Sequence, residues 1–284
     1  MRSLLTADDV FAHVLMLSAV SKKLFILVEG DSDCAVIDPH LDTAVCDTLP
    51  SGGTVANLGA IEIARSQNLD SVAAVSDLDW ADVLYPRQTN QNVFYVDFYD
   101  IDALVFSRKQ NVRSVVANFT VRSTMRDHMR AIGETDAVDI ISRIAFPIGV
   151  LRCLSEKHSW GLATRKFPIH LVLDDSKIQV DLPKLASLAV SRSKGAAITA
   201  SEIIPILEAE IHSITDPYRY CSGHDLINAL SVVAREKWNG KAGGDTLAAA
   251  IRSAFNCSDA QSSALFSAIR KWGEGNGSDV LSCT

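Results

Sequence analysis

Acidic side chains follow two apolar runs of strand length near the start of the chain. The run Leu24–Val28 is followed directly by Glu29. The run Val72–Val75 is followed by Asp77 and Asp79. Continuous apolar runs are typical of parallel strands buried on both faces, so polar residues leave them only at their ends. Carboxylates gathered at the ends of such strands could hold a divalent metal ion, which prefers hard oxygen ligands.

The spacing of these acids predicts how each would reach a common site. Gly30 follows Glu29 and would let the chain turn sharply. Asp33 lies four residues after Glu29, so in the first turn of a following helix its carboxylate would point back over the strand end. On an extended backbone, Asp77 and Asp79 would share one face about 7 Å apart. Four converging carboxylates repel one another, and without a cation some of them would have to be protonated.

Each motif taken alone has a simpler interpretation. Asp31 and Ser32 could cap a helix, and most D-x-D sequences are solvated turns. The two motifs occur together, each after an apolar run and about fifty residues apart, which favours a shared metal site. Within the first motif we expect Asp31 to be a turn or cap residue and Asp33 to be the ligand.

The first half of the chain alternates between strand and helix patterns. Such alternation predicts βαβ units with a parallel sheet, and right-handed crossovers bring the named strand ends to one edge. The expected helices cover residues 6–20, with Thr6 as cap, 32–39 and 60–67. The expected strands cover residues 23–29, 43–48, 71–77 and 92–97. The fold class is therefore α/β, a mainly parallel sheet flanked by helices and followed by a mostly helical C-terminal region.

From about residue 101 apolar residues recur at three- and four-residue steps, which predicts helices. We divide the chain into a metal-binding domain, 1–110, and a helical region, 111–284. The expected helices cover 101–108, 122–132, 136–157, 183–190, 201–213, 223–237, 245–255 and 259–272. Pro147 should kink or break the helix over 136–157. We expect a short β hairpin over 169–173 and 177–180. The Gly/Ser-rich tail from Gly273 should be frayed.

Composition narrows the classes of protein that this chain can be. Of its 284 residues 48% are hydrophobic and 21% charged, which indicates a globular protein with a sizeable core. The net charge of −7 means that a nucleic-acid partner would need a local basic face. The six cysteines form no C-x-x-C pair, so we expect reduced thiols and no zinc site. No segment suits a bilayer, so we expect a cytoplasmic protein with no membrane partner.

The order of the acidic motifs resembles the Toprim fold, the catalytic module of topoisomerases, bacterial primases and OLD-family nucleases. That fold pairs a strand-terminal glutamate with a downstream D-x-D, as Glu29 stands to Asp77 and Asp79 here. The spacing of Glu29 and Asp33 is similar to the OLD-type variant. The resemblance covers roughly residues 22–105. It implies a Mg²⁺ (or Mn²⁺) cofactor held by these acids.

Two further segments resemble a Toprim-related family of small bacterial phage-defence proteins that includes the nuclease subunit of the PARIS system. Tyr99-Asp100-Ile101-Asp102 is similar to its YDIE segment, with Asp102 in place of glutamate. This makes Asp102 a further candidate metal ligand, while Asp100 is either a helix cap or a ligand. Gly223-His224-Asp225 is similar to a G-K-D motif, which makes His224 a candidate catalytic residue in the lysine position or a plain first-turn residue.

The resemblance implies a metal-dependent nuclease that cuts DNA or RNA, such as tRNA, as a regulated toxin in anti-phage defence. Glu29 would bind metal or act as general base, and an ATPase partner would restrain the activity. The oligomeric state stays open, and a homodimer is one alternative. The alternative is a catalytically weak Toprim-fold regulatory or binding subunit of an ATPase-containing defence complex. A small-molecule phosphotransferase is a third hypothesis, although Trp80 after the D-x-D argues against a haloacid-dehalogenase-type phosphatase.

Overall fold

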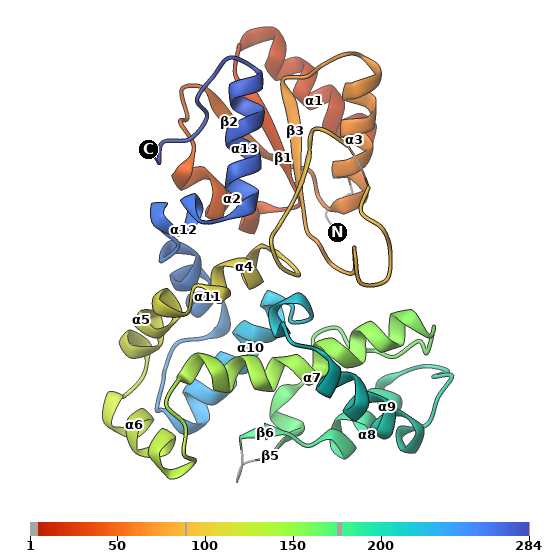
Figure 1. The fold of residues 1–284 in the computed structure, drawn as a ribbon, viewed down its shortest axis with the longest axis vertical. Helices are drawn as coiled ribbons and strands as arrows, with labels where there is room; N and C mark the ends of the chain where they lie inside the picture. The colour runs from red at the N-terminus through yellow and green to blue at the C-terminus, as the bar shows by residue number, and fades with distance from the viewer. Residues whose placement is uncertain (1–4, 89, 175–177, 284) are drawn as a thin grey trace. The chain divides into compact units, whose positions relative to one another are not determined.

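The chain forms two compact units, residues 1–101 with 255–284 and residues 102–254. The structure is a computed structural model and describes residues 5–88, 90–174 and 178–283. Each unit is described by itself below, with the element labels of Figure 1.

The first unit is built on a four-stranded parallel sheet in the order β2-β1-β3-β4. Every neighbouring pair of strands runs parallel, so all four carboxyl ends lie at one edge. The strands are β1 (Leu24–Val28), β2 (Cys46–Pro50), β3 (Val72–Ser76) and β4 (Val93–Tyr95). The predicted α/β class is confirmed, because buried apolar runs form the central strands β1 and β3.

Helices cover both faces of this sheet (Figure 1). On one face α1 (Ala7–Val20) packs against α3 (Thr54–Ser66), and both bury apolar side chains with Phe25 and Leu27 of β1. Thr6 caps α1 as predicted, since its hydroxyl accepts the Asp9 N–H at 3.2 Å. The remaining elements are α2 (Asp31–Ile37), the 3-10 turn η1 (Asp38–His40), α12 (Cys257–Gln261) and α13 (Ala264–Gly275). On the other face α13 packs on β4, with the Phe94 and Trp272 ring centroids 6.2 Å apart.

The second unit is mostly helical and is organised around α7 (Ala137–Lys157), which packs against α5, α9 and α10. Its other helices are α4 (Ile101–Ser107, entering from the first unit), α5 (Lys109–Phe119), α6 (Arg122–Ala131), α8 (Leu182–Arg192), α9 (Ala200–Ser213), α10 (Gly223–Lys237) and α11 (Gly244–Ser253), with the 3-10 turns η2 (Ile169–Leu171) and η3 (Pro217–Arg219). Gly149 lets α7 approach the chain closely, because a Cβ there would lie 2.1 Å from the Tyr220 carbonyl oxygen. No helix in the described ranges is long and apolar enough to cross a membrane.

Several expected elements differ from those observed. Helix α7 continues through Pro147 without a break. The hairpin is reduced to β5 (Leu173–Asp174) and β6 (Gln179–Val180), antiparallel to each other, and most of its expected turn lies outside the described residues. Helix α5 was not predicted, and α3 begins at Thr54 instead of residue 60.

The C-terminal segment belongs to the first unit, which differs from the expected division at residue 110. Asp97 accepts the backbone N–H groups of Ala264 and Leu265, at 3.1 and 2.9 Å, and so receives α13. The Trp272 indole donates to the Asp70 carbonyl at 3.1 Å. The expectation of a frayed tail is wrong, because Val280 is buried and accepts the Asp42 N–H at 2.9 Å.

Candidate metal centre

Glu29 leaves the end of β1 and is held by three donors. Its Oε2 accepts the Thr54 hydroxyl at 2.9 Å. Its Oε1 accepts the Asp77 backbone N–H at 3.2 Å and faces the Ser76 hydroxyl at 3.4 Å. Since β1 and β3 are paired neighbours, the glutamate bridges the ends of both strands. The sheet therefore brings Glu29 and Asp77 together, as the sequence predicts.

Asp77 has an environment dominated by negative charge. One of its oxygens accepts the Ile101 N–H at 3.3 Å. Burial raises the pKa of Asp77 well above its usual value, and nearby carboxylates raise it further. In falling order of effect these are Asp100, Glu29, Asp33 and Asp79. Burial likewise raises the pKa of Glu29, against the hydrogen bonds from Thr54 and Asp77, which lower it, and the Asp79 charge adds to the rise.

Asp33 points back over the strand end, as its position predicts. It lies in the first turn of α2, is 8% exposed, and accepts the Gly30 N–H at 2.8 Å. Asp31 is exposed at the start of the same helix. Gly30 does not use the conformational freedom expected of it for a sharp turn, because its φ of −158° is extended backbone that any residue can adopt. An added Cβ there would meet only Ser32 Oγ within 4 Å, at 3.9 Å.

The D-x-D segment does not have the extended backbone that we expected. Strand β3 ends at Ser76, and Asp79 has a φ of +43°. The chain turns here because Leu78 and Trp80 are both buried, Trp80 with its ring edge-on to Tyr99 at 4.8 Å. Asp79 is exposed, and the extended backbone on which the predicted common face with Asp77 was based is absent here. Its charge nevertheless raises the pKa of both Glu29 and Asp77, which places it near them.

Asp102 and His224 belong to the second unit, whereas the other predicted site residues belong to the first. Both oxygens of Asp102 accept hydrogen bonds from the Arg252 guanidinium, each at 2.6 Å. This bidentate pair occupies the carboxylate, so Asp100 replaces Asp102 as the acid of this segment that acts on Asp77. His224 is exposed at the second position of α10, where a first-turn residue was the alternative interpretation.

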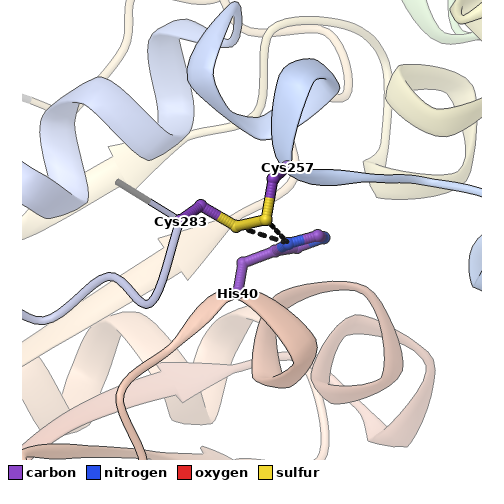
Figure 2. A group of neighbouring side chains, drawn as sticks. All are labelled: His40, Cys257 and Cys283. Atoms are coloured by element: carbon purple, nitrogen blue, oxygen red, sulfur yellow. Dashed lines mark hydrogen bonds between the residues drawn. A yellow bond between two sulfur atoms is a disulfide. The ribbon is translucent and has the colours of Figure 1, made fainter.

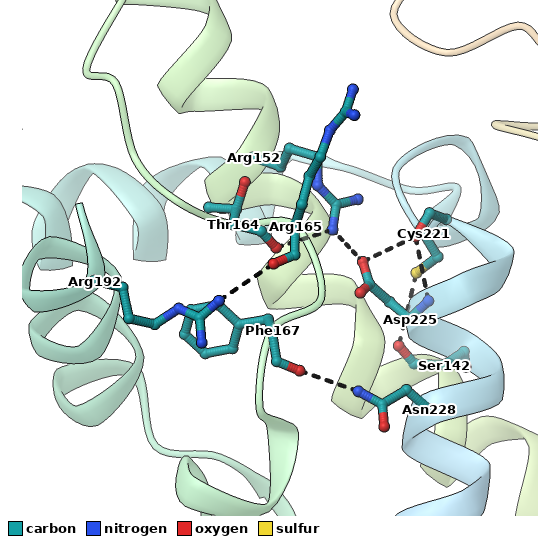
Figure 3. A network of polar contacts seen from close by, with 10 residues as sticks. Ser142, Arg152, Thr164, Arg165, Phe167, Arg192, Cys221, Asp225 and Asn228 are labelled. Carbon is teal, nitrogen blue, oxygen red and sulfur yellow. Dashed lines mark hydrogen bonds and ion pairs between the residues drawn. The ribbon is translucent and has the colours of Figure 1, made fainter. Parts of the chain in front are cut away.

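Asp225, the third residue of the Gly223-His224-Asp225 motif, forms hydrogen bonds and an ion pair with neighbouring side chains inside the second unit (Figure 3). It is fully buried, and its Oδ2 accepts hydrogen bonds from Arg152 of α7 and from the Ser222 hydroxyl. Three residues further along α10, the Asn228 side-chain amide donates to the Phe167 carbonyl at 3.0 Å. The motif thus fastens α10 to its neighbours through a buried ion pair.

The loop after β2 supports the strand ends and was not recognised as part of the site. Because Val28 pairs with Pro50, the loop that follows lies beside Glu29. The Ser51 hydroxyl donates to the Val28 carbonyl at 2.8 Å, and the next two residues, Gly52 and Gly53, have φ angles of +84° and +133°. Such angles favour glycine and allow Thr54 to open α3 next to the glutamate.

A cavity of about 610 Å³ adjoins this loop. It is lined by residues 5–7 and 52–56, so Thr54 contributes both to the cavity and to the hydrogen bonds of Glu29. No residue of this loop was predicted to belong to the site. Its role beside Glu29 depends on strand order, which a local motif does not encode.

The chain was compared with protein-family models and with curated proteins. Neither comparison finds a match. The assignment of chemistry therefore rests on the geometry of the strand ends.

The donor set at the strand ends suits a hard cation. The groups are carboxylate oxygens whose charges raise one another's pKa, so a divalent cation would relieve their repulsion. Among the described residues, the group of three metal-binding side chains whose ligand atoms lie within 4.8 Å of one another is His40, Cys257 and Cys283, in a different part of the unit. Mg²⁺ usually retains several waters, so two or three of these carboxylates would suffice to bind it.

Proposed function

We propose that this protein is a metal-dependent nuclease whose centre is the acidic edge of the parallel sheet. One observation carries the proposal: Glu29 and Asp77, at the ends of paired strands, are both half-buried, and their charges repel one another. A protein gains nothing in stability from such an arrangement, so a cation or a reaction is the physical reason to keep it.

The proposed ligands are Glu29, Asp33, Asp77 and Asp79, with Asp100 in the place first given to Asp102. When bound, Mg²⁺ or Mn²⁺ would polarise a phosphate and lower the pKa of a water molecule. Glu29 is fixed in orientation by Thr54, Ser76 and the Asp77 N–H. Its raised pKa brings it closer to neutral pH, where a carboxylate is a more effective general base.

The resemblance to the Toprim-related defence family supports the choice of substrate class. It favours cleavage of DNA or of an RNA such as tRNA, with the activity held back by an ATPase partner until phage infection. Two of the basic residues that could contribute to a nucleic-acid face are paired with acids, Lys109 with Asp139 and Arg113 with Asp136. The substrate would therefore approach through a restricted positive surface.

A second candidate function is a regulatory or binding subunit of an ATPase-containing complex with little catalysis. Two observations favour it over a nuclease. The motif position occupied by lysine in the family holds the exposed His224, and the Asp102 carboxylate is engaged by Arg252.

Cleavage of a mixed DNA and RNA pool by purified protein distinguishes the two functions. With Mg²⁺ or Mn²⁺, we expect Glu29→Gln to lose about 100-fold or more of the wild-type rate, which is the scale of a lost ligand or general base. Glu62→Gln is the matched control, because Glu62 is an exposed glutamate on α3 of the same unit. A pool left equally intact by wild type and Glu29→Gln, both purified free of the restraining ATPase, would contradict the nuclease and support the binding subunit.

A further inference from the structure

Three soft-ligand side chains meet where the end of the chain packs against η1 (Figure 2). Cys257, at the start of α12, forms a disulfide with Cys283, with their Cα atoms 5.3 Å apart. His40 Nδ1 lies 3.2 Å from Cys283 Sγ and 3.9 Å from Cys257 Sγ. The expectation of six reduced cysteines is wrong at this pair, since chain folding joins residues 26 positions apart that no local spacing connects.

Backbone contacts hold His40 beside Cys283 independently of the disulfide. The Ser282 N–H donates to the His40 carbonyl at 2.9 Å, and Leu41 forms an antiparallel bridge with Leu281. The Arg270 guanidinium donates to the Cys283 carbonyl at 3.0 Å. Reduction of the disulfide would therefore leave the imidazole and the Cys283 sulfur in place.

The surroundings of His40 favour its neutral form. The ring is 3% exposed and lies edge-on to Phe255 and Phe266, each at a centroid distance of 5.4 Å. Burial lowers the pKa of His40, against the opposing effect of the Asp259 carboxylate. A neutral imidazole keeps a nitrogen lone pair for a metal, and Asp259 adds negative charge that favours a cation.

We propose that His40, Cys257 and Cys283 form a Zn²⁺ site when the disulfide is reduced. In tetrahedral zinc with ordinary bond lengths, a nitrogen and a sulfur ligand are about 3.5 Å apart. The two Nδ1–Sγ distances of 3.2 and 3.9 Å bracket this value, so the sulfurs need only separate from each other. Two thiolates balance the charge of Zn²⁺, and the exposed position of Cys257 leaves the fourth coordination position facing solvent.

Two balanced steps convert the disulfide into the metal site. A dithiol reductant gives two electrons and two protons to the Cys257–Cys283 bond, which yields two thiols and leaves the reductant as its own disulfide. Zn²⁺ then binds the two sulfurs as thiolates and releases two protons to solvent. The same side chains therefore hold either a covalent bond or a metal ion, according to the thiol–disulfide balance.

Metal titration of the full chain tests this site. The protein is reduced under anaerobic conditions, freed of reductant, and titrated with Zn²⁺ against a chromophoric chelator. Parallel samples receive Co²⁺, whose thiolate charge-transfer absorption reports sulfur ligation. We expect one thiolate-bound ion per reduced chain and none per re-oxidised chain. Cys257→Ser and Cys283→Ser should weaken binding by about 100-fold or more, beyond the effect typical of a lost outer partner.

Two control variants separate this site from other ways of binding zinc. Cys34→Ser removes a free, half-buried cysteine of the same unit and should leave the titration unchanged. Glu29→Gln should also leave the thiolate absorption unchanged, so failure of the acidic centre and failure of this site are distinguishable. Circular dichroism checks that each variant is folded. The proposal is overturned if folded, reduced wild type shows no thiolate-bound ion, or if Cys257→Ser binds as tightly as Cys34→Ser.

Discussion

Asp225 is fully buried and Asp77 is half-buried, and the charges around these two acids differ in sign. Asp225 accepts hydrogen bonds from the Arg152 guanidinium and the Ser222 hydroxyl. Asp77 is surrounded by carboxylates, and these raise its pKa beyond the effect of burial. Asp225 is therefore neutralised by a cation of the protein itself, whereas Asp77 would be neutralised by a bound cation.

This difference separates structural acids from candidate functional acids within one chain. Asp102 resembles Asp225, because Arg252 binds both of its oxygens. Glu29 resembles Asp77, because its donors are hydroxyl and backbone groups and the leading charge acting on it is Asp79. The sequence motif predicts that Asp102 is a metal ligand, but its ion pair with Arg252 indicates a structural role.

Breaking the neutralised pair should have the largest effect on stability. Arg152→Ala would leave Asp225 buried without its cation, which typically costs about 3–5 kcal/mol. Arg235→Ala is the control, since the exposed Arg235–Glu236 pair should contribute no more than about 1 kcal/mol. Urea denaturation measures both. Equal midpoints for the two variants would show that Asp225 does not depend on Arg152.

Removing one charge from the acidic edge should increase the stability of the metal-free protein, in contrast to the loss expected for Arg152→Ala. The raised pKa of Asp77 means that the folded state binds more protons than the unfolded state above pH about 4. Metal-free protein should therefore lose stability as the pH rises from about 4 toward the raised pKa. Asp77→Asn removes this loss and should stabilise the metal-free protein at pH 7.

Thermal melts without metal at several pH values measure this effect, with exposed Asp70→Asn as the control on the same unit. The contrast between Asp77 and Asp225 is contradicted if the stability of the metal-free wild type rises as the pH increases from about 4. It also fails if Asp77→Asn is less stable than Asp70→Asn at pH 7.

Thr54→Val should have the smallest effect on stability of the three substitutions, and it tests how the donors around Glu29 set its pKa. It removes the hydroxyl that donates to Glu29 at 2.9 Å and that lowers the pKa of this glutamate. We expect a loss of about 0.5–1 kcal/mol and an upward shift of the Glu29 pKa, seen as a rise in the pH midpoint of metal-dependent activity. Thr48→Val is the matched control, because the Thr48 hydroxyl donates to Asp38 instead. A midpoint shifted equally by both variants would rule out a specific role for Thr54.

The sheet and the convergence of its acids could be predicted from local patterns. Buried strands such as Leu24–Val28 need continuous apolar runs, and parallel connections bring their ends to one edge. The position of Asp33 also followed from local geometry, since the first turn of α2 directs its carboxylate to the Gly30 N–H.

Long-range partners could not be predicted, because no local pattern encodes them. Arg152 and Asp225 are 73 residues apart, and Arg252 lies 150 residues from Asp102. Thr54 reaches Glu29 only because β2 lies beside β1. The turn at Asp79 arises from the burial of Leu78 and Trp80, which compete with the extended conformation that we expected.

Direct binding of Mn²⁺, followed by electron paramagnetic resonance of the free ion, tests the central claim that the acidic edge holds a divalent cation. The account predicts saturable binding to wild type and to Glu62→Gln, and binding at least about tenfold weaker in folded Asp77→Asn and Glu29→Gln. Equal binding by all four proteins, or no binding by wild type, would contradict it.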